Sequence, residues 1–319
     1  MNHSAPNSDP PHGSAPAEAP AGGFGPYLIL AAAFLWGTSG TAQALAPAGS
    51  TPLVIGSIRV GLGGIVLVLG AGIRGDFAGA RRFLRPIFLL TGLLQALFNF
   101  SYFTALSLTG VAVGTMVAIG SAPIFAGLLG ITFNGERVGV RWYAGTVAAL
   151  VGLVLLIGGE GSVHVDLFGV LFALCAGFSY SFFTFLSGRL VREFAPDAVI
   201  GVSFMIATAM LSPFFLIVPL GWIASSAGIG TMLYMGLISS GVAYMLYGRG
   251  LKTVLVSNVG ILTLAEPLTA SVLGIVFLRE PMTSTTLAGI ALIFFAQVLI
   301  VRRRPRAGAR VRASRSTVS

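Results

Sequence analysis

An acidic residue in the middle of an apolar segment is the first feature of this sequence that points to chemistry. Glu266 lies in the stretch TLAEPLTASVLGIVFLRE, residues 263–280, and Pro267 follows it directly. Inside a membrane an ionised side chain costs about 2.5–3.5 kcal/mol on insertion scales, so it normally faces a cavity or a partner. Three interpretations stay open: a protonated structural carboxyl, a group that binds an ammonium ion in a wet cavity, and a proton-coupling site.

A basic residue in a second apolar segment raises the same question. Arg59 is the one charged residue in the run 52–73. Its guanidinium can snorkel to the membrane interface, hold an external gate, or neutralise a carboxylate of a ligand or of the protein. Snorkelling is the default interpretation.

Amide and hydroxyl side chains form further stripes at helical spacing. Gln95, Asn99 and Tyr102 occupy positions i, i+4 and i+7 of one segment, which places them on one face of a helix. The other predicted binding residues are Trp36, Gln43, Tyr180, Tyr244, Tyr247 and Asn258. Together with Glu266 they suit a small amphipathic solute with hydrogen-bonding ends and an apolar or aromatic body. Taken singly, each has a plainer explanation in hydrogen bonds between helices or in an aromatic belt at the interface.

The composition indicates what kind of molecule must position these groups. Of 319 residues, 55% are hydrophobic and only 9% are charged, and the mean hydropathy is +0.91. Because soluble domains carry about 25% charged residues, the sequence predicts an integral membrane protein. Seven of the 19 basic residues lie in the C-terminal segment RRRPRAGARVRASRS. A basic segment directly after an apolar run indicates contact with anionic membrane lipid rather than with nucleic acid.

Several kinds of site are not expected in this chain. The sequence has no Walker lysine motif, which argues against ATP hydrolysis. Cys175 is the single cysteine, and the histidines are His3, His12 and His164, two in the N-terminal tail and one in a loop. No disulfide within the chain, no metal site and no cofactor are therefore expected, and no catalytic residues are assigned.

The apolar segments are long enough for ten membrane-spanning helices. A span needs about 20 mostly apolar residues, and only helices of this length satisfy their own backbone polar groups in lipid. The predicted spans are 27–46, 52–73, 86–108, 110–133, 141–159, 166–188, 197–220, 227–249, 254–278 and 284–301. The predicted fold is therefore an all-α integral membrane protein.

The distribution of arginine and lysine predicts the orientation of these spans. With a cytoplasmic N-terminus, 17 basic residues fall in cytoplasmic segments, and only Arg279 falls in an outside loop. Cytoplasmic loops are enriched in basic residues, so both termini are expected in the cytoplasm. We expect a disordered cytoplasmic tail over 1–26 and a basic cytoplasmic tail over 302–319, with membrane lipid around the spans.

The sequence also contains an internal repeat. When Pro123 is aligned with Pro267, an offset of 144 residues, Ala126, Gly130 and Glu136 also fall on identical residues. The repeats are predicted over 27–159 and 166–301, five spans each. Because five is odd, the second copy must enter the membrane from the opposite side, and transporters place their sites between such inverted repeats.

Four features of the repeat have expected structural roles. Pro123 and Pro267 lack an amide proton, so we expect kinks at mid-depth that act as hinges. The small residues Ala122, Ala126, Gly130, Ala270 and Gly274 are expected to pack helices closely rather than contact a ligand. Glu136 and Glu280 are expected to favour the positive end of the helix that follows each of them. The second copy carries Glu266 where the first has Ala122, as an asymmetric ligand would require.

The motifs resemble those of a known transporter family. AFLWGTSGTA, the stretch from YFTALSLTG to FNGERV, and TLAEPLTASVLGIVFLREPMT are similar to the EamA family of the drug/metabolite transporter superfamily, over residues 27–303. Within that family the chain looks most like bacterial amino-acid exporters of the YddG type. The resemblance implies ten helices around a central cavity and export of amino acids, aromatic and other apolar ones included, or of related metabolites.

Two other functions are considered beside amino-acid export. One is efflux of drugs or other metabolites, and the other is a polytopic membrane enzyme that acts on lipid. The enzyme would need an acid–base group of residues in or near the membrane, and beyond Glu266 and Arg59 the spans offer hardly any titratable side chains. The expected partners are a small-molecule substrate and membrane lipid, with the protein acting as a monomer or homodimer.

Overall fold

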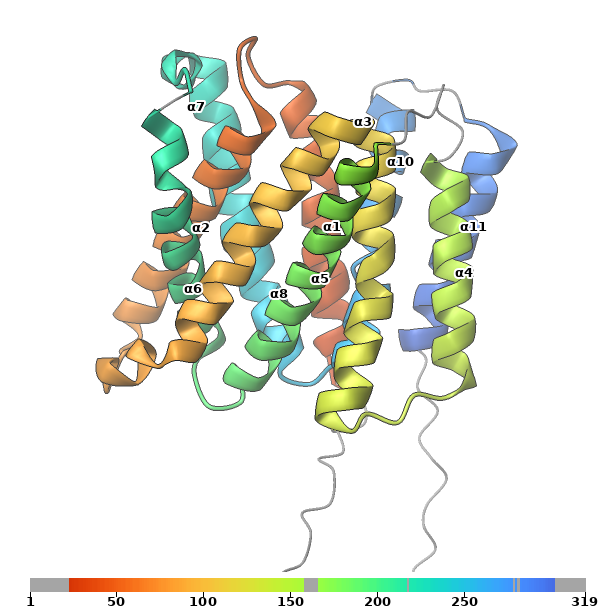
Figure 1. The fold of residues 1–319 in the computed structure, drawn as a ribbon, viewed down its shortest axis with the longest axis horizontal. Coiled ribbons are helices and arrows are strands. Elements are labelled where there is room, and N and C mark those ends of the chain that lie inside the picture. Colours follow the sequence, from red (N-terminus) through yellow and green to blue (C-terminus); the bar gives the residue numbers. More distant parts are fainter. Residues whose placement is uncertain (1–22, 158–165, 217, 278, 280–281, 302–319) are drawn as a thin grey trace, which may run out of the picture.

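The computed structural model describes residues 23–157, 166–216, 218–277, 279 and 282–301. The predicted tails lie almost wholly outside the described residues, and Glu280 lies outside them as well. Within them the chain forms a bundle of roughly antiparallel helices (Figure 1).

The helices follow the predicted spans closely. The first repeat contains α1 Gly25–Ala44, α2 Pro52–Ile73, α3 Pro86–Asn134 and α4 Val140–Ile157. The second repeat contains α5 Leu167–Leu190, α6 Pro196–Leu211, α7 Ser226–Leu233, a π-helical segment Tyr234–Val242, α8 Ala243–Leu251, α9 Val256–Leu262, α10 Ala265–Phe277 and α11 Ser284–Val301. Short 3₁₀ turns precede α3 and follow α6.

These elements combine into ten helical rods within the described part of the chain. Gly110 adopts φ 80° and ψ 163° and divides α3 into two spans, a backbone conformation that glycine adopts without steric cost. Eight of the rods are long and apolar enough to cross a membrane, and the other two are Gly25–Ala44 and the shorter Val140–Ile157. The predicted all-helical membrane fold with two repeats of five helices is confirmed.

The two prolines of the repeat lie in different local structures. The ninth span is interrupted, because α9 ends at Leu262 and α10 begins at Ala265. Pro267 has no amide proton for the Thr263 carbonyl, which instead accepts a hydrogen bond from the Glu266 N–H at 3.0 Å. By contrast, α3 stays helical through Pro123. Their role as hinges therefore stays a prediction.

Close helix packing joins the repeats near these prolines. A Cβ atom on Gly260 of α9 would lie 2.6 Å from Cα of Pro123 in α3, which is closer than real side chains approach. The absence of a side chain therefore lets the two pseudo-equivalent spans touch through their backbones. This contact brings the interruption of the ninth span to the middle of the bundle.

Candidate functional site

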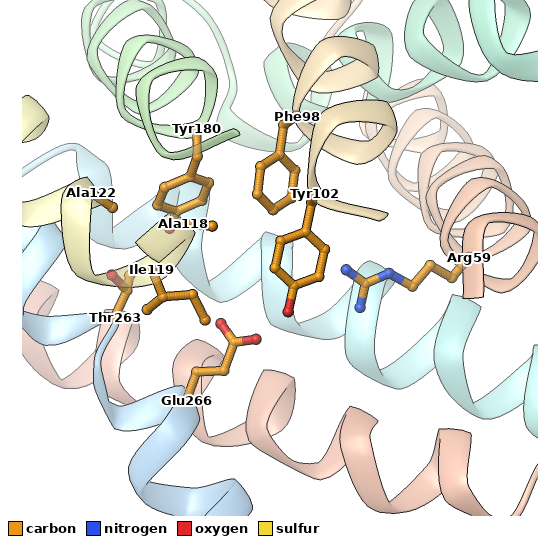
Figure 2. A pocket seen from close by; sticks show the side chains of 9 residues that line it. All are labelled: Arg59, Phe98, Tyr102, Ala118, Ile119, Ala122, Tyr180, Thr263 and Glu266. Atoms are coloured by element: carbon orange, nitrogen blue, oxygen red, sulfur yellow. The ribbon is translucent and has the colours of Figure 1, made fainter. Parts of the chain in front are cut away.

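A pocket with a cavity volume of about 60 Å³ lies between the two repeats. Figure 2 shows the side chains that line it. They come from both repeats and are Arg59, Phe98, Tyr102, Ala118, Ile119, Ala122, Tyr180, Thr263 and Glu266. Like small-molecule sites, it has mostly apolar walls and a few polar groups.

Residues at equivalent positions of the two repeats meet in the pocket. The offset of 144 residues pairs Ile119 with Thr263 and Ala122 with Glu266, and all four residues line the pocket. The same offset pairs Trp36 with Tyr180, whose rings meet edge to face at 6.5 Å. Pseudo-equivalent residues from opposite repeats thus face one common space.

One acidic and one basic side chain enter this space from different repeats. Glu266 lies in the first turn of α10, where the positive end of the helix dipole favours a carboxylate. Arg59 lies in α2, and Figure 2 shows both charged groups directed toward the Tyr102 hydroxyl between them. No ion pair joins the two side chains in the part of the chain that is described.

Aromatic rings form one wall of the site. Phe98 stacks on Tyr102 at 5.7 Å and meets Tyr180 at 5.6 Å. Behind Tyr180, Trp36 lies 4.8 Å from Tyr244 and 5.2 Å from Tyr247, measured between ring centroids. Four predicted residues on α1, α5 and α8 are thereby brought into one cluster. The Tyr247 hydroxyl is already paired with Thr184 Oγ1 at 2.6 Å, which indicates a supporting role.

Several buried polar atoms in this region have no hydrogen-bond partner among the described residues. They are Arg59 Nε, Trp36 Nε1, Gln95 Oε1 and Asn99 Oδ1. Gln95 and Asn99 are each only 1% exposed. The side-chain amide of Asn99 donates a hydrogen bond to the backbone carbonyl of Gln95 at 2.9 Å. An unpaired buried polar group costs about 1–3 kcal/mol, so a polar ligand or water that pairs with these atoms is favoured.

The predicted site residues fall into three groups. Tyr102, Tyr180 and Glu266 line the pocket. Trp36, Tyr244 and Tyr247 form the aromatic cluster beside it, and Gln95 and Asn99 are buried on α3. Gln43 lies in the last turn of α1 and Asn258 in the first turn of α9, and neither is among the lining residues.

Sequence reasoning underestimated three lining residues. Arg59 was expected to snorkel to the interface, but its guanidinium enters the pocket (Figure 2). Ala122 was expected only to pack helices, yet it lines the pocket opposite its repeat partner Glu266. Phe98 was not singled out, because an apolar ring in an apolar span carries no signal. For Arg59 a signal was present, since its repeat partner is the uncharged Ser203.

Glu136 caps a different helix from the one expected. Its carboxylate accepts hydrogen bonds from the backbone N–H groups of Val256 and Ser257, at 3.0 and 3.1 Å. These residues begin α9 in the second repeat, whereas the expectation was α4, the helix that follows Glu136. The carboxylate therefore stabilises the positive end of a helix across the seam between the repeats.

Comparison with known proteins agrees with this arrangement. The model of the EamA-like transporter family matches residues 23–158 and again residues 167–302. The chain is 39% identical to the uncharacterised transporter YwfM of Bacillus subtilis (strain 168), over 88% of this chain and 94% of that protein. It is 28% identical to the aromatic amino acid exporter YddG of Ancylobacter novellus, over 76% of this chain and 84% of that protein. The expected likeness to the YddG type is thus the more distant of the two.

A solved crystal structure shares the fold. It superposes with a TM-score of 0.76 at 23% sequence identity and covers 86% of this chain and 95% of the other.

Proposed function

The chain belongs to the EamA-like transporter family of the drug/metabolite transporter superfamily, and on that premise we propose that it exports amino acids by alternating access. It is a multi-pass membrane transporter rather than an enzyme. Amino acids with aromatic or other apolar side chains, or closely related metabolites, are the proposed solutes. The proposed location is the bacterial inner membrane with both termini in the cytoplasm.

The observation that carries this proposal is the placement of Arg59 and Glu266 on one pocket with an aromatic wall. A free amino acid has a carboxylate and an ammonium group at one end and an apolar side chain at the other. We assign the ligand carboxylate to Arg59, because a guanidinium matches its planar geometry, and the ammonium group to Glu266. Phe98, Tyr102 and Tyr180 then receive the side chain.

The buried polar atoms support the same assignment. A ligand carboxylate supplies an acceptor to Arg59 Nε, a donor on a pocket-lining residue that the described residues leave unpaired. An amino acid is itself asymmetric, and this explains why each of the two charges occurs in only one repeat. The printed name of the YddG relative, an aromatic amino acid exporter, is consistent with this choice.

Counterflow with purified protein in liposomes tests the proposal. Vesicles loaded with unlabelled phenylalanine should accumulate labelled phenylalanine from outside, and protein-free vesicles should not. Phenethylamine lacks the carboxylate and 3-phenylpropionate lacks the ammonium group, so each should compete at least about tenfold more weakly than phenylalanine, because it leaves one charged partner unpaired.

The outcome separates the proposed function from its rival within the family. If either analogue competes as well as phenylalanine, the pocket does not bind a zwitterion through both charges. If cationic drugs compete while amino acids do not, the protein is an efflux transporter of another specificity.

A further inference from the structure

One face of the bundle carries polar and aromatic contacts between the repeats. We call it the basic face, and it is formed by the connections 74–85, 135–139, 191–195 and 252–255, at the bottom of Figure 1. Phe194 of the second repeat packs there against Phe83 and Phe88 of the first, with ring centroids 5.0 and 5.3 Å apart. The Trp142 indole N–H donates to the Ser257 carbonyl at 2.8 Å.

A buried carboxylate makes the shortest ionic contact on this face. Asp197, in the first turn of α6, is only 4% exposed. Its Oδ2 accepts a hydrogen bond from Arg74 Nη2 at 2.6 Å and lies 3.5 Å from Arg249 Nη2. Arg74 caps the end of α2 in the first repeat, and Arg249 lies in α8 of the second. The contact of Arg74 with Asp197 therefore crosses the seam between the repeats.

The repeat shows that this ionic contact has no equivalent on the opposite face. The offset of 144 residues pairs Pro52 with Pro196, the first residues of α2 and α6, so the register holds for these helices. Under it Asp197 corresponds to Leu53 and Arg74 to Val218. Val218 packs in an apolar cluster with Val54 and Trp222. Among the described residues, the positions on the opposite face that correspond to Arg74 and Asp197 are therefore apolar.

From this asymmetry we propose that Arg74, Asp197 and Arg249 form a one-sided latch that holds the transporter closed at the basic face. Opening the pocket toward that face requires α2 to separate from α6 and thus the Arg74–Asp197 contact to break. The inference rests on the alternating-access part of the proposed function. It does not depend on which solute is carried.

The burial of Asp197 distinguishes this contact from an ordinary surface pair on the same face. Arg85 and Glu193 also join the two repeats, at 3.4 Å, but their side chains are 49% and 59% exposed. Exposed pairs contribute little. In the Arg74–Asp197 contact the Arg74 side chain is 46% exposed and the Asp197 side chain only 6% exposed, so loss of Arg74 leaves a buried carboxylate less compensated. Glu193→Gln is therefore a matched control for Asp197→Asn: each changes a carboxylate to an amide in a pair that crosses the seam.

Cysteine accessibility without substrate tests the latch. In a Cys175→Ser background, Ile119→Cys places a reporter thiol on the pocket wall. A membrane-impermeant thiol reagent is applied to inside-out and right-side-out vesicles, and the labelling rate is measured from each face. Asp197→Asn and Arg74→Gln should each raise the rate from the basic face about tenfold, and the double variant should gain no more than either single variant, because they break one contact.

The latch is overturned if, in both single variants, the rate of thiol labelling from the basic face stays within twofold of the rate in the protein that carries only Cys175→Ser and Ile119→Cys. An equal increase in Glu193→Gln would overturn it as well, because the effect would then not belong to the buried contact. Gel filtration in detergent checks that each variant is folded. If Asp197→Asn does not fold, Arg74→Gln alone tests the latch. If the latch variants show the predicted change in accessibility but the unmodified protein shows no counterflow of amino acids, the proposed solute is wrong and the latch still holds.

Discussion

At the scale of single residues, two isolated charges account for the chemistry of the site. Glu266 and Arg59 are both expensive to bury in a membrane, and both line the same pocket. Their repeat partners are Ala122 and Ser203, so the repeat itself does not account for either charge. This is why we assign both charges to the proposed ligand.

Glu266→Gln tests this at the residue scale. The glutamine amide keeps the shape of the side chain but lacks the negative charge that we propose binds the ligand ammonium group. Initial counterflow rates should therefore fall at least about tenfold. Any dependence of transport on pH between 5 and 8 that arises from Glu266 should also disappear, since the amide does not titrate. Rates at several pH values in proteoliposomes provide the measurement.

The control for this substitution is Glu193→Gln, which makes the same change at a half-exposed carboxylate on the basic face. If Glu266→Gln transports at the same rate as the unmodified protein at every pH from 5 to 8, Glu266 is a structural carboxyl, the first of its three interpretations.

At the scale of elements, irregular helices shape the pocket. The break at residues 263–264 places Thr263 and Glu266 together on the pocket wall, next to the start of α10. The π-helical segment Tyr234–Val242 contacts α1 through hydrogen bonds of Ser239 with Ser39 at 2.5 Å and of Tyr234 with Thr38 at 2.6 Å. Such segments are common near functional sites because they change which residues face a neighbouring helix.

The close contact of α9 with α3 predicts a stability effect. A methyl group on Gly260 would meet the Pro123 backbone at 2.6 Å, so Gly260→Ala should destabilise the protein by about 1–3 kcal/mol. Gly230→Ala in α7 is the control, because a Cβ atom there meets nothing within 4 Å. Alanine favours helix over glycine, so the control should hold or gain stability. Thermal unfolding in detergent compares the two, and an equal loss in both would show that the contact is looser than described.

At the scale of the whole molecule, a duplicated scaffold supports functions that are not duplicated. Pseudo-equivalent helices supply the pocket walls, while the ligand charges and the latch each occur in one copy only. Symmetry in the backbone gives two similar ways to open, and asymmetry in the side chains sets the relative stability of the two states.

The orientation of the bundle is testable with two matched alanines. Ala78 lies in the connection 74–85 of the basic face and Ala48 in the connection after α1, and both are exposed. In a Cys175→Ser background, Ala48→Cys in intact cells should react with an impermeant thiol reagent. Ala78→Cys should react only after the membrane is opened, because basic segments stay in the cytoplasm. Reaction of both from the outside would contradict the proposed topology.

Hydropathy was enough to predict the ten spans, the repeat and the isolated Glu266, because each depends on local composition and on a fixed offset along the chain. Gln95 and Tyr244 were predicted to bind the substrate, and neither is among the residues that line the pocket. Three other features could not be predicted in this way. They are the entry of Arg59 into the pocket, the cap that Glu136 places on α9, and the contact of Arg74 with Asp197. Each joins residues more than a hundred positions apart. Such pairings depend on how the two repeats pack, and hydrophobic periodicity specifies which face of a helix is buried but not which distant helix covers it.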